Sequence, residues 1–376
     1  MSLPERYAFI AEWYDQNAAI IRSYQLLFYA SDNTVEMYDI KNRRIFLKRS
    51  KIDNVRFEDL YIGGTINVHS RQLNLVEYAD EFTKKQLSSK KEKTLAMIKP
   101  DAVSKFGAII DMIYGGGFLI ANAKMIQITR KDAEEFYQEH VQRPFFDKLV
   151  RFMASGSIVV MELMGNSAVT EWRKLLGPTD SSKARSEAPS SVRAKFGTDQ
   201  TMNACHGSDA TETGQRETNF FFGPEKKWKN TAKLSGSTCC VIKPSAILEG
   251  KAGKIMMAIV EAGFEVSALQ MFHLEKANAE EFFEVYKGVV NEYSEMVQEL
   301  CSGPCFALEI TGKGERTAED FREFVGPADP EIARNLRPKT LRAIFGRDKI
   351  KNAVHCTDLP EDCPLEVAYF FQILAD

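Results

Sequence analysis

His206 is the residue best placed to do chemistry, because cations and a hydroxyl precede it in an order that suits a polyphosphate. Lys99, Arg173, Thr179 and Arg193 all come before it in the chain. Lysine supplies a point charge, and the planar fork of arginine fits phosphate oxygens at two points. A neutral imidazole can attack phosphorus and form a covalent intermediate, which divides one transfer into two steps. The set predicts phosphoryl transfer through His206. A histidine beside glycine in a loop is more often structural when it stands alone.

The same order of residues returns later in the chain. Four pairs keep one constant spacing: Arg173 and Arg322, Arg193 and Arg342, Asn203 and Asn352, and His206 and His355. Upstream, the segment 94–103 returns as 238–247, which matches Lys99 with Lys243. The period is far longer than the ~20–50 residues of solenoid repeats, so a whole domain has been duplicated.

Each copy must hold these residues on a similar set of elements. A short apolar strand ends at Lys-Pro, because proline cannot continue the ladder. An amphipathic helix follows, with apolar residues at i, i+3 and i+4: Ile109, Met112 and Ile113, then Ile255, Ala258 and Ile259. Helices are also predicted at 131–139 and 278–286, and buried strands at 158–161 and 305–310. This order predicts a sheet with helices on one face.

Residues before about 90 contain none of the repeated motifs. Apolar residues alternate there on both sides of a polar turn at 31–33, and again further on: Tyr24, Leu26, Phe28, Val35 and Met37, then Ile66, Val68, Leu73 and Leu75. The alternation predicts a small, mostly β leader domain. The basic stretch 41–51 is interpreted as a solvated hairpin rather than a binding patch. Linkers are predicted at 84–93 and 224–237.

Composition excludes several classes of protein. The 376 residues are 44% hydrophobic and carry a net charge of −3, which argues against global disorder and against nucleic-acid binding. No signal core opens the chain and no run reaches ~18 apolar residues, so we expect a soluble, intracellular protein without a membrane partner. The seven cysteines lack a Cys-x-x-Cys pair. Cys301 and Cys305 have no second pair, so reduced, mostly buried thiols are expected rather than a metal site.

Three runs carry a family resemblance: Ile-Lys-Pro-Asp at 98–101, Arg-Pro-Phe-Phe at 143–146 and Asn-x-x-His-Gly-Ser-Asp at 203–209. They resemble the nucleoside diphosphate kinases over about residues 92–222 and again over 237–374. The resemblance implies an α+β fold with two tandem ferredoxin-like (β-α-β-β-α-β) kinase domains, A at 92–223 and B at 237–376, after a mostly-β domain at 1–91. It also implies a phosphotransferase that moves the γ-phosphate of a nucleoside triphosphate to a nucleoside diphosphate through a phosphohistidine.

The resemblance assigns a role to each residue of the first site. His206 would be the nucleophile, and Glu217 would fix its tautomer. The other contacts it implies are these: Arg173, Thr179 and Arg193 with the β- and γ-phosphates, Lys99 and Asn203 with the sugar hydroxyls and phosphate, Tyr137 near the nucleophile, and Phe145 stacked on the base with Leu149 beneath. Mg²⁺ would bridge the nucleotide phosphates with little direct protein ligation.

The second copy keeps part of this set and loses part of it. It retains five polar residues of the site: Lys243, Arg322, Arg342, Asn352 and His355. Residues 289–293 replace the Arg-Pro-Phe-Phe run, Ala328 stands where the phosphate-binding threonine is expected, and Cys356 replaces the glycine after the histidine. We therefore expect a degenerate, mainly structural second site.

The arrangement of a β-rich leader before two kinase domains looks like that of family members found in cilia and centrosomes. The leader, from its start at 9–15, is similar to the DM10 domain of ciliary and flagellar proteins. The resemblance implies a place in the cytoplasm and cytoskeleton, at the axoneme or centrosome. Its implied partners are ATP and other nucleotides, with tubulin or a microtubule-associated assembly such as the gamma-tubulin ring complex as a candidate. We expect a monomer with an intramolecular pseudo-dimer. A mainly structural component of ciliary microtubules, with the kinase fold as a docking surface, stays open as the alternative to an enzyme.

Overall fold

The structure, a computed structural model, describes residues 6–15, 18–52, 55, 57–69, 71–87 and 92–375. Contacts divide the chain into two units, Met1–Lys91 with His273–Pro304, and Glu92–Phe272 with Cys305–Asp376. The sequence-based domain boundaries stay a prediction, and the predicted linker at 84–93 lies partly outside the described residues. No helix within the described ranges combines the length and apolar character needed to cross a bilayer.

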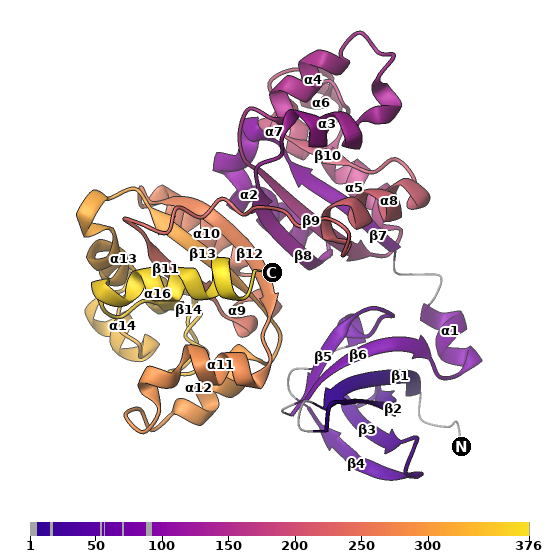
Figure 1. Cartoon of the computed structure of the whole chain (residues 1–376), viewed down its shortest axis with the longest axis vertical. Helices are drawn as coiled ribbons and strands as arrows, with labels where there is room; N and C mark the ends of the chain where they lie inside the picture. Colours follow the sequence, from indigo (N-terminus) through magenta and orange to yellow (C-terminus); the bar gives the residue numbers. More distant parts are fainter. Residues whose placement is uncertain are drawn as a thin grey trace. The chain divides into compact units, whose positions relative to one another are not determined.

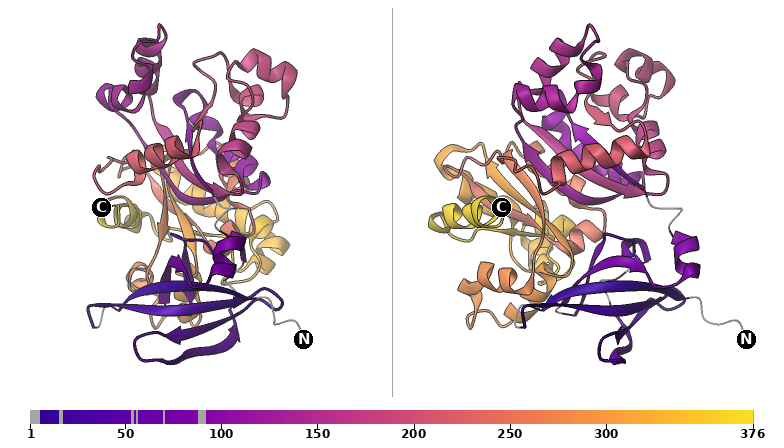
Figure 2. Two further views of the ribbon diagram at one scale, coloured as in Figure 1. Left: turned by 90° about the vertical axis from the view of Figure 1, so that its right-hand side faces the viewer. Right: turned by 45° about the vertical axis from the view of Figure 1, so that its right-hand side comes forward.

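The leader is a six-stranded antiparallel sheet followed by a helix. Its elements are β1 (Arg6–Asp15), β2 (Ile20–Tyr29), β3 (Thr34–Asp39), β4 (Arg44–Lys51), β5 (Thr65–Val68), β6 (Arg71–Tyr78) and α1 (Glu81–Leu87), in the sheet order β4-β3-β2-β1-β6-β5. Figure 2 shows these strands as a curved sheet. The predicted alternating residues fill its core, and Leu26, Phe28 and Met37 have no exposed surface. The mostly-β leader is confirmed.

The first kinase copy follows the β-α-β-β-α-β order, with extra helices. Its strands and helices are β7 (Glu92–Ile98), α2 (Phe106–Gly115), β8 (Leu119–Ile126), α3 (Arg130–Phe136), α4 (Phe146–Met153), β9 (Ile158–Gly165), α5 (Ala168–Leu176), α6 (Ser181–Glu187), α7 (Val192–Phe196), β10 (Cys205–Gly207) and α8 (Thr211–Phe222). The strands pair in the order β10-β7-β9-β8. This is the predicted ferredoxin-like arrangement. The helices predicted around 109–113 and 131–139 correspond to α2 and α3, and the strands predicted before Lys99 and at 158–161 correspond to β7 and β9.

The second copy repeats these elements. They are β11 (Thr238–Ile242), α9 (Pro244–Leu248), α10 (Ala252–Glu261), β12 (Glu265–His273), α11 (Lys276–Phe282), α12 (Tyr293–Leu300), β13 (Pro304–Thr311), α13 (Thr317–Val325), α14 (Pro330–Leu336), α15 (Leu341–Phe345), β14 (Val354–Cys356) and α16 (Cys363–Ala368). Helices α11 and α12 fall in the first contact unit, and most of the copy falls in the second. The duplication that the spacing predicts is therefore a duplication of structure.

Helices cover both faces of the first copy's sheet, and the expectation of helices on one face is wrong (Figure 1). Ala96 and Ile98 of β7 belong to the core that includes α2 and α5. Leu95 and Met97 of the same strand belong to a second core with α3, α4 and α8. A strand that is buried on both faces needs consecutive apolar residues rather than alternating ones, and the run 95–98 is apolar throughout.

The two copies share one sheet and one core within the second unit. Strand β8 pairs with β12 through Lys124 and Gln270, which extends the sheet to eight strands. Helices α2 and α10 pack against each other and meet closely at two glycines. A Cβ added to Gly107 would lie 2.8 Å from the backbone nitrogen of Met257, and one added to Gly253 would lie 2.4 Å from that of Asp111.

The segment predicted as a polar linker at 224–237 is held in place at several points. Trp228 packs on the rings of Phe220 and Phe221, and Lys226 forms an ion pair with Asp132 at 2.8 Å. Further along, the buried carboxylate of Glu309 accepts hydrogen bonds from two backbone amides and from Ser237. The chain between the copies is therefore packed on both of them, which its polar composition did not indicate.

Candidate functional site

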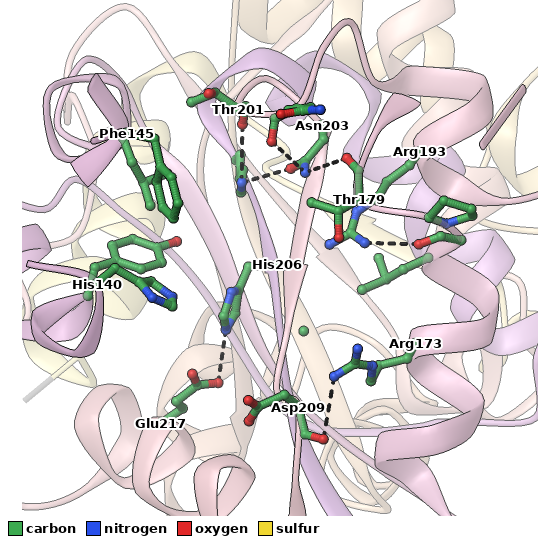
Figure 3. A pocket seen from close by; sticks show the side chains of 18 of the residues that line it. His140, Phe145, Arg173, Thr179, Arg193, Thr201, Asn203, His206, Asp209 and Glu217 are labelled. Carbon is green, nitrogen blue, oxygen red and sulfur yellow. Dashed lines mark hydrogen bonds and ion pairs between the residues drawn. The ribbon is translucent and has the colours of Figure 1, made fainter. Parts of the chain in front are cut away.

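A cavity of about 460 Å³ opens in the first kinase copy. Its wall contains all ten residues predicted for the first site: Lys99, Tyr137, Phe145, Leu149, Arg173, Thr179, Arg193, Asn203, His206 and Glu217. They come from strand β10, from the four helices α4, α5, α7 and α8, and from the loops beside these elements. Phe145, Arg193 and His206 are among the labelled side chains that face one another around the cavity (Figure 3). The fold thus brings together side chains that are far apart in sequence, while their individual roles stay predictions.

His206 lies on the short strand β10 and is oriented by Glu217 of α8. Its Nε2 is 2.9 Å from Oε2 of Glu217, which also accepts a hydrogen bond from Ser208 at 2.7 Å. Burial raises the pKa of the Glu217 carboxyl, but the charge of His206 and these hydrogen bonds outweigh it and lower that pKa overall. An ionised carboxylate can only accept, so Nε2 carries a proton. In the neutral form of the ring, Nδ1 then keeps its lone pair.

The backbone around β10 is specialised for this placement. Ala204 adopts a left-handed conformation with φ of 67°, which costs energy for a residue with a side chain. Its backbone nitrogen donates to the carboxylate of Asp101 at 3.0 Å, and its carbonyl accepts from the backbone nitrogen of Lys99 at 2.8 Å. Two residues that follow β7 therefore hold the strained residue in place. After His206, a Cβ on Gly207 would lie 2.5 Å from Nε1 of Trp172. The Asn-x-x-His-Gly run therefore reflects backbone geometry as well as chemistry.

A hydrogen-bond network holds positive charge at one side of the cavity. Nζ of Lys99 donates to Oδ1 of Asn203 at 2.8 Å and to the carbonyl of Thr201 at 3.2 Å. Asn203 in turn donates to the carbonyl of Thr179 at 3.0 Å. Burial, together with the nearby charge of Arg193, lowers the pKa of Lys99 to about 8. A buried cation with a second cation beside it favours an anionic ligand.

Two arginines complete the cationic side. Arg193 of α7 donates to the carbonyls of Gly177 and Cys205 at 2.9 and 3.1 Å, and burial lowers its pKa. Its Nε is buried and has no hydrogen-bond partner. Arg173 of α5 donates to the carbonyl of Asp209 at 3.4 Å. Both guanidinium groups donate to neutral carbonyls, and a hydrogen bond from Thr213, together with the charge of Arg173, lowers the pKa of the Asp209 carboxyl. Neither arginine forms an ion pair among the described residues, so both can attract an anion.

Aromatic rings form the opposite wall of the cavity. Tyr137 stands edge-on to His206 with ring centroids 5.9 Å apart, and its buried hydroxyl has no hydrogen-bond partner. Phe145, just before α4, is 46% exposed although it is a large apolar ring. The ring centroids of His140 and Phe145 are 5.7 Å apart. An exposed ring at the edge of a polar cavity suits stacking on a planar group.

The sequence did not assign roles to three other residues of the site. His140 and Thr201 line the cavity, and Ser208 holds the carboxylate that orients His206. Ser208 lies within the quoted His-Gly-Ser-Asp run, so its position could have indicated a role. Thr201 acts through its backbone carbonyl, for which the side chain gives no signal.

The second copy keeps the orientation of its histidine but exposes it less. Nε2 of His355 is 2.8 Å from Glu366, and the side chain of His355 is 6% exposed against 19% for His206. Cys356 stands where the first copy has Gly207, and Phe321 stands where it has the larger Trp172. Cys356 and Phe321 are both buried in the same core. Ala353 repeats the left-handed conformation of Ala204, with φ of 71°.

The phosphate-side residues of the second copy differ in their contacts. Arg322 forms an ion pair with the carboxylate of Asp358. Asn352 donates to the carbonyl of Ala328 at 2.9 Å, as Asn203 does to Thr179, but its buried Oδ1 has no partner. Nζ of Lys243 donates to the carbonyl of Ile350 at 2.9 Å, and Arg342 repeats the carbonyl contacts of Arg193. The second copy therefore differs from the first chiefly in the carboxylate that pairs with its Arg322.

Two family models match this chain. The model described as nucleoside diphosphate kinase matches residues 92–227 and 236–374, and the model described as the nucleoside diphosphate kinase 7 N-terminal PH domain matches residues 1–89. The leader is therefore similar to a PH domain, and the DM10 resemblance is not confirmed.

Relatives match this chain over different shares of its length. The nucleoside diphosphate kinase homolog 7 of Mus musculus is 57% identical over 98% of this chain and 94% of its own length. The nucleoside diphosphate kinase of Aquifex aeolicus is 47% identical over 35% of this chain and 94% of its own length. A crystal structure of the Aquifex aeolicus enzyme covers the same shares with a TM-score of 0.34. From the two family matches and the near full-length similarity to homolog 7, the chain belongs to the nucleoside diphosphate kinase family.

Proposed function

We propose that the first copy is an active nucleoside diphosphate kinase that works through a phosphohistidine at His206. The observation that carries the proposal is the imidazole whose Nε2 is held by Glu217 at 2.9 Å, with Nδ1 left to act as a nucleophile beside a cationic wall. The Aquifex aeolicus protein that this copy resembles is a nucleoside diphosphate kinase, which supports the same activity here.

In the first half-reaction, Nδ1 of His206 attacks the γ-phosphorus of a nucleoside triphosphate. The N–P bond forms as the bond from phosphorus to the β,γ-bridging oxygen breaks, and the nucleoside diphosphate leaves with that electron pair. Glu217 stabilises the positive charge that develops on the ring. A second nucleoside diphosphate then attacks the phosphohistidine, which restores His206 and releases a new triphosphate.

The cationic wall and the exposed ring suggest how the substrate is held. Lys99, Arg173 and Arg193 offer charges to the phosphates, with the hydroxyl of Thr179 beside them. Phe145 would stack on the base, and stacking tolerates every base because each has a π-face.

The polar wall fits a Mg²⁺ ion that arrives on the nucleotide phosphates. Glu217 is hydrogen-bonded to His206 and Ser208, and Asp209 accepts a hydrogen bond from Thr213. Because these carboxylates already have partners, the phosphates rather than the protein would supply most ligands of the ion. No cluster of three or more metal-ligating side chains occurs in the described part of the chain. The bound ion would neutralise charge on the phosphates during transfer.

Transfer of label tests the proposal directly. Full-length protein incubated with γ-³²P-labelled ATP should acquire acid-labile, base-stable phosphate, and added GDP should remove it as labelled GTP. The His206→Ala chain should do neither. A wild-type chain that stays folded and takes up no label would refute the activity.

We also propose a structural role at ciliary or centrosomal microtubules, in which the second copy and the leader serve mainly for docking. The ion pair of Arg322 with Asp358 and the reduced exposure of His355 support a second copy that is kept for its fold. Replacement of the chain in ciliated cells by its His206→Ala form separates the two roles. Normal axonemes and localisation in those cells would support docking, whereas loss of both would tie function to catalysis.

A further inference from the structure

Strand β4 forms one edge of the leader sheet and has features of a docking edge. In the sheet order it pairs with β3 on one side, and within the described residues no strand pairs with its other side (Figure 1). An edge strand presents a row of unpaired backbone N–H and C=O groups, to which an extended chain can add as a further strand.

The edge is strongly basic in a chain whose net charge is −3. The segment 41–51 contains no acidic residue and carries these cations: Lys41, Arg43, Arg44, Lys48, Arg49 and Lys51. Arg49 pairs with Asp32 at 2.6 Å and lies over the ring of Tyr29. The other five form no ion pair among the described residues, and their side chains are exposed. The charge of this hairpin is therefore available to a partner.

Apolar surface accompanies the charge. Ile45 is 54% exposed and Phe46 is 36% exposed, and Ile40, just before the hairpin turn, is 40% exposed. Phe46 is fixed by contacts with Tyr24 and with the guanidinium of Arg71. A solvated hairpin needs no such apolar residues, so charge alone does not account for the surface.

A second copy of this chain does not suit the edge. Paired strands lie ~4.8 Å apart, and two β4 edges in that position would bring two sets of unpaired cations together. Like charges directly opposite each other destabilise a strand pair, and basic edges are a known defence against self-association. The same charges attract a chain of opposite sign.

We propose that β4 binds an acidic, extended peptide segment of a partner protein as an added strand. Backbone groups of β4 would pair with the peptide on either side of Leu47, next to which the pairing with β3 shifts register twice. Lys48 and Lys51 would contact carboxylates of the peptide, and Ile45 and Phe46 would contact its apolar residues. This site is separate from the nucleotide cavity, and its existence does not depend on kinase activity.

Fluorescence anisotropy with full-length protein tests the proposal. The probe is a fluorescein-labelled decapeptide with a repeating Glu-Glu-Val-Val sequence, which puts carboxylates and apolar side chains on both faces of a strand. The control peptide has Gln in place of Glu. We expect binding of the acidic peptide alone, weakened as salt is raised. The Lys48→Glu/Lys51→Glu chain should bind it at least ~10-fold more weakly. The Lys254→Glu/Lys339→Glu chain makes the same charge change at two exposed lysines of the second kinase copy, and should bind normally.

Hydrogen exchange distinguishes strand addition from loose charge attraction. Bound peptide should slow amide exchange in residues 44–51, and melting temperatures should show that both double variants are folded. Peptide binding without that protection, or equal loss in both double variants, would overturn the proposal. So would binding to vesicles of phosphatidylcholine with ~20% phosphatidylserine that depends on Lys48 and Lys51 while the peptide fails to bind.

Discussion

Arg322 forms an ion pair with Asp358, whereas Arg173, at the same place in the first copy, donates to the backbone carbonyl of Asp209. The second copy therefore satisfies with its own carboxylate the arginine that a phosphate would otherwise engage. We infer that this internal contact competes with nucleotide at the second site.

Removal of the competing carboxylate should strengthen nucleotide binding by the second copy. The Arg193→Ala substitution in the full-length chain weakens the first site, so that binding by the second site can be measured. We expect the second site to bind nucleotide at least ~10-fold more weakly than the wild-type first site, a difference of ~1.4 kcal/mol. Adding Asp358→Asn should recover part of that difference in a calorimetric titration with a magnesium nucleotide. The matched Asp209→Asn substitution should change nucleotide affinity less, because Arg173 bonds to the backbone carbonyl of Asp209 and not to its carboxylate. An unchanged isotherm for Asp358→Asn would show that the ion pair does not limit binding.

The two histidines should differ sharply in their effect on turnover. His206→Ala removes a covalent nucleophile that alanine cannot replace, so kcat should fall by several orders of magnitude. His355→Ala should leave most of the activity, because its site has lost the threonine and the free arginine charge. Steady-state transfer from ATP to a second nucleoside diphosphate measures both. Equal losses would mean that the copies contribute equally.

The depressed pKa of Lys99 predicts a loss of activity at alkaline pH. With a pKa of about 8 rather than 10.5, the ammonium is charged below pH 8 and neutral above it. A neutral lysine attracts phosphate less, so kcat/KM should fall above pH ~8, by up to ~10-fold for each further unit. Lys99→Arg should remove this fall, since arginine stays charged throughout that range. A flat profile for the wild-type protein up to pH 10 would contradict the assignment.

The close contact between α2 and α10 predicts that replacing Gly107 with alanine lowers stability, although alanine normally stabilises a helix. In a helix, alanine is favoured over glycine by up to ~1 kcal/mol. At Gly107 the new Cβ would lie 2.8 Å from backbone, which cannot move aside as a flexible side chain can, so overpacking of ~1–3 kcal/mol should win. Gly107→Ala should therefore lower the melting temperature.

A glycine at the end of the same helix provides the control. A Cβ on Gly115 would meet no atom within 4 Å, so Gly115→Ala should be neutral or stabilising. Denaturant titrations of the two variants should separate by more than ~1 kcal/mol in free energy of unfolding. Equal stabilities would indicate that the helices can shift apart at no cost.

Local patterns predicted much of this molecule. Alternating residues such as Leu26, Phe28 and Met37 indicated the leader's strands because a half-buried strand has a period of two. Constant spacing between Arg193 and Arg342 indicated two similar structures. The family resemblance, which rests on three short runs, located the ten side chains that line one cavity.

What the sequence did not predict depends on contacts between distant segments. The pairing of Arg322 with Asp358 joins α13 to the loop after β14, and neither residue is unusual within its own segment. The linker is polar, yet Trp228 and the carboxylate of Glu309 fix it. The run 95–98 is apolar at every position, which is typical of a strand covered on both faces, whereas the order of elements predicts helices on one face only.

The shared sheet of β8 and β12 changes how the two sites can evolve. In an assembly of identical subunits, every substitution appears in all active sites at once, so a damaging one silences them all. Here one gene encodes two neighbours that mutate separately, and the pair Cys356 and Phe321 differs from Gly207 and Trp172 without disturbing the sheet. Selection on the second copy can then act on the strand and helix it offers to the first, and its nucleotide pocket is free to drift or to acquire another use.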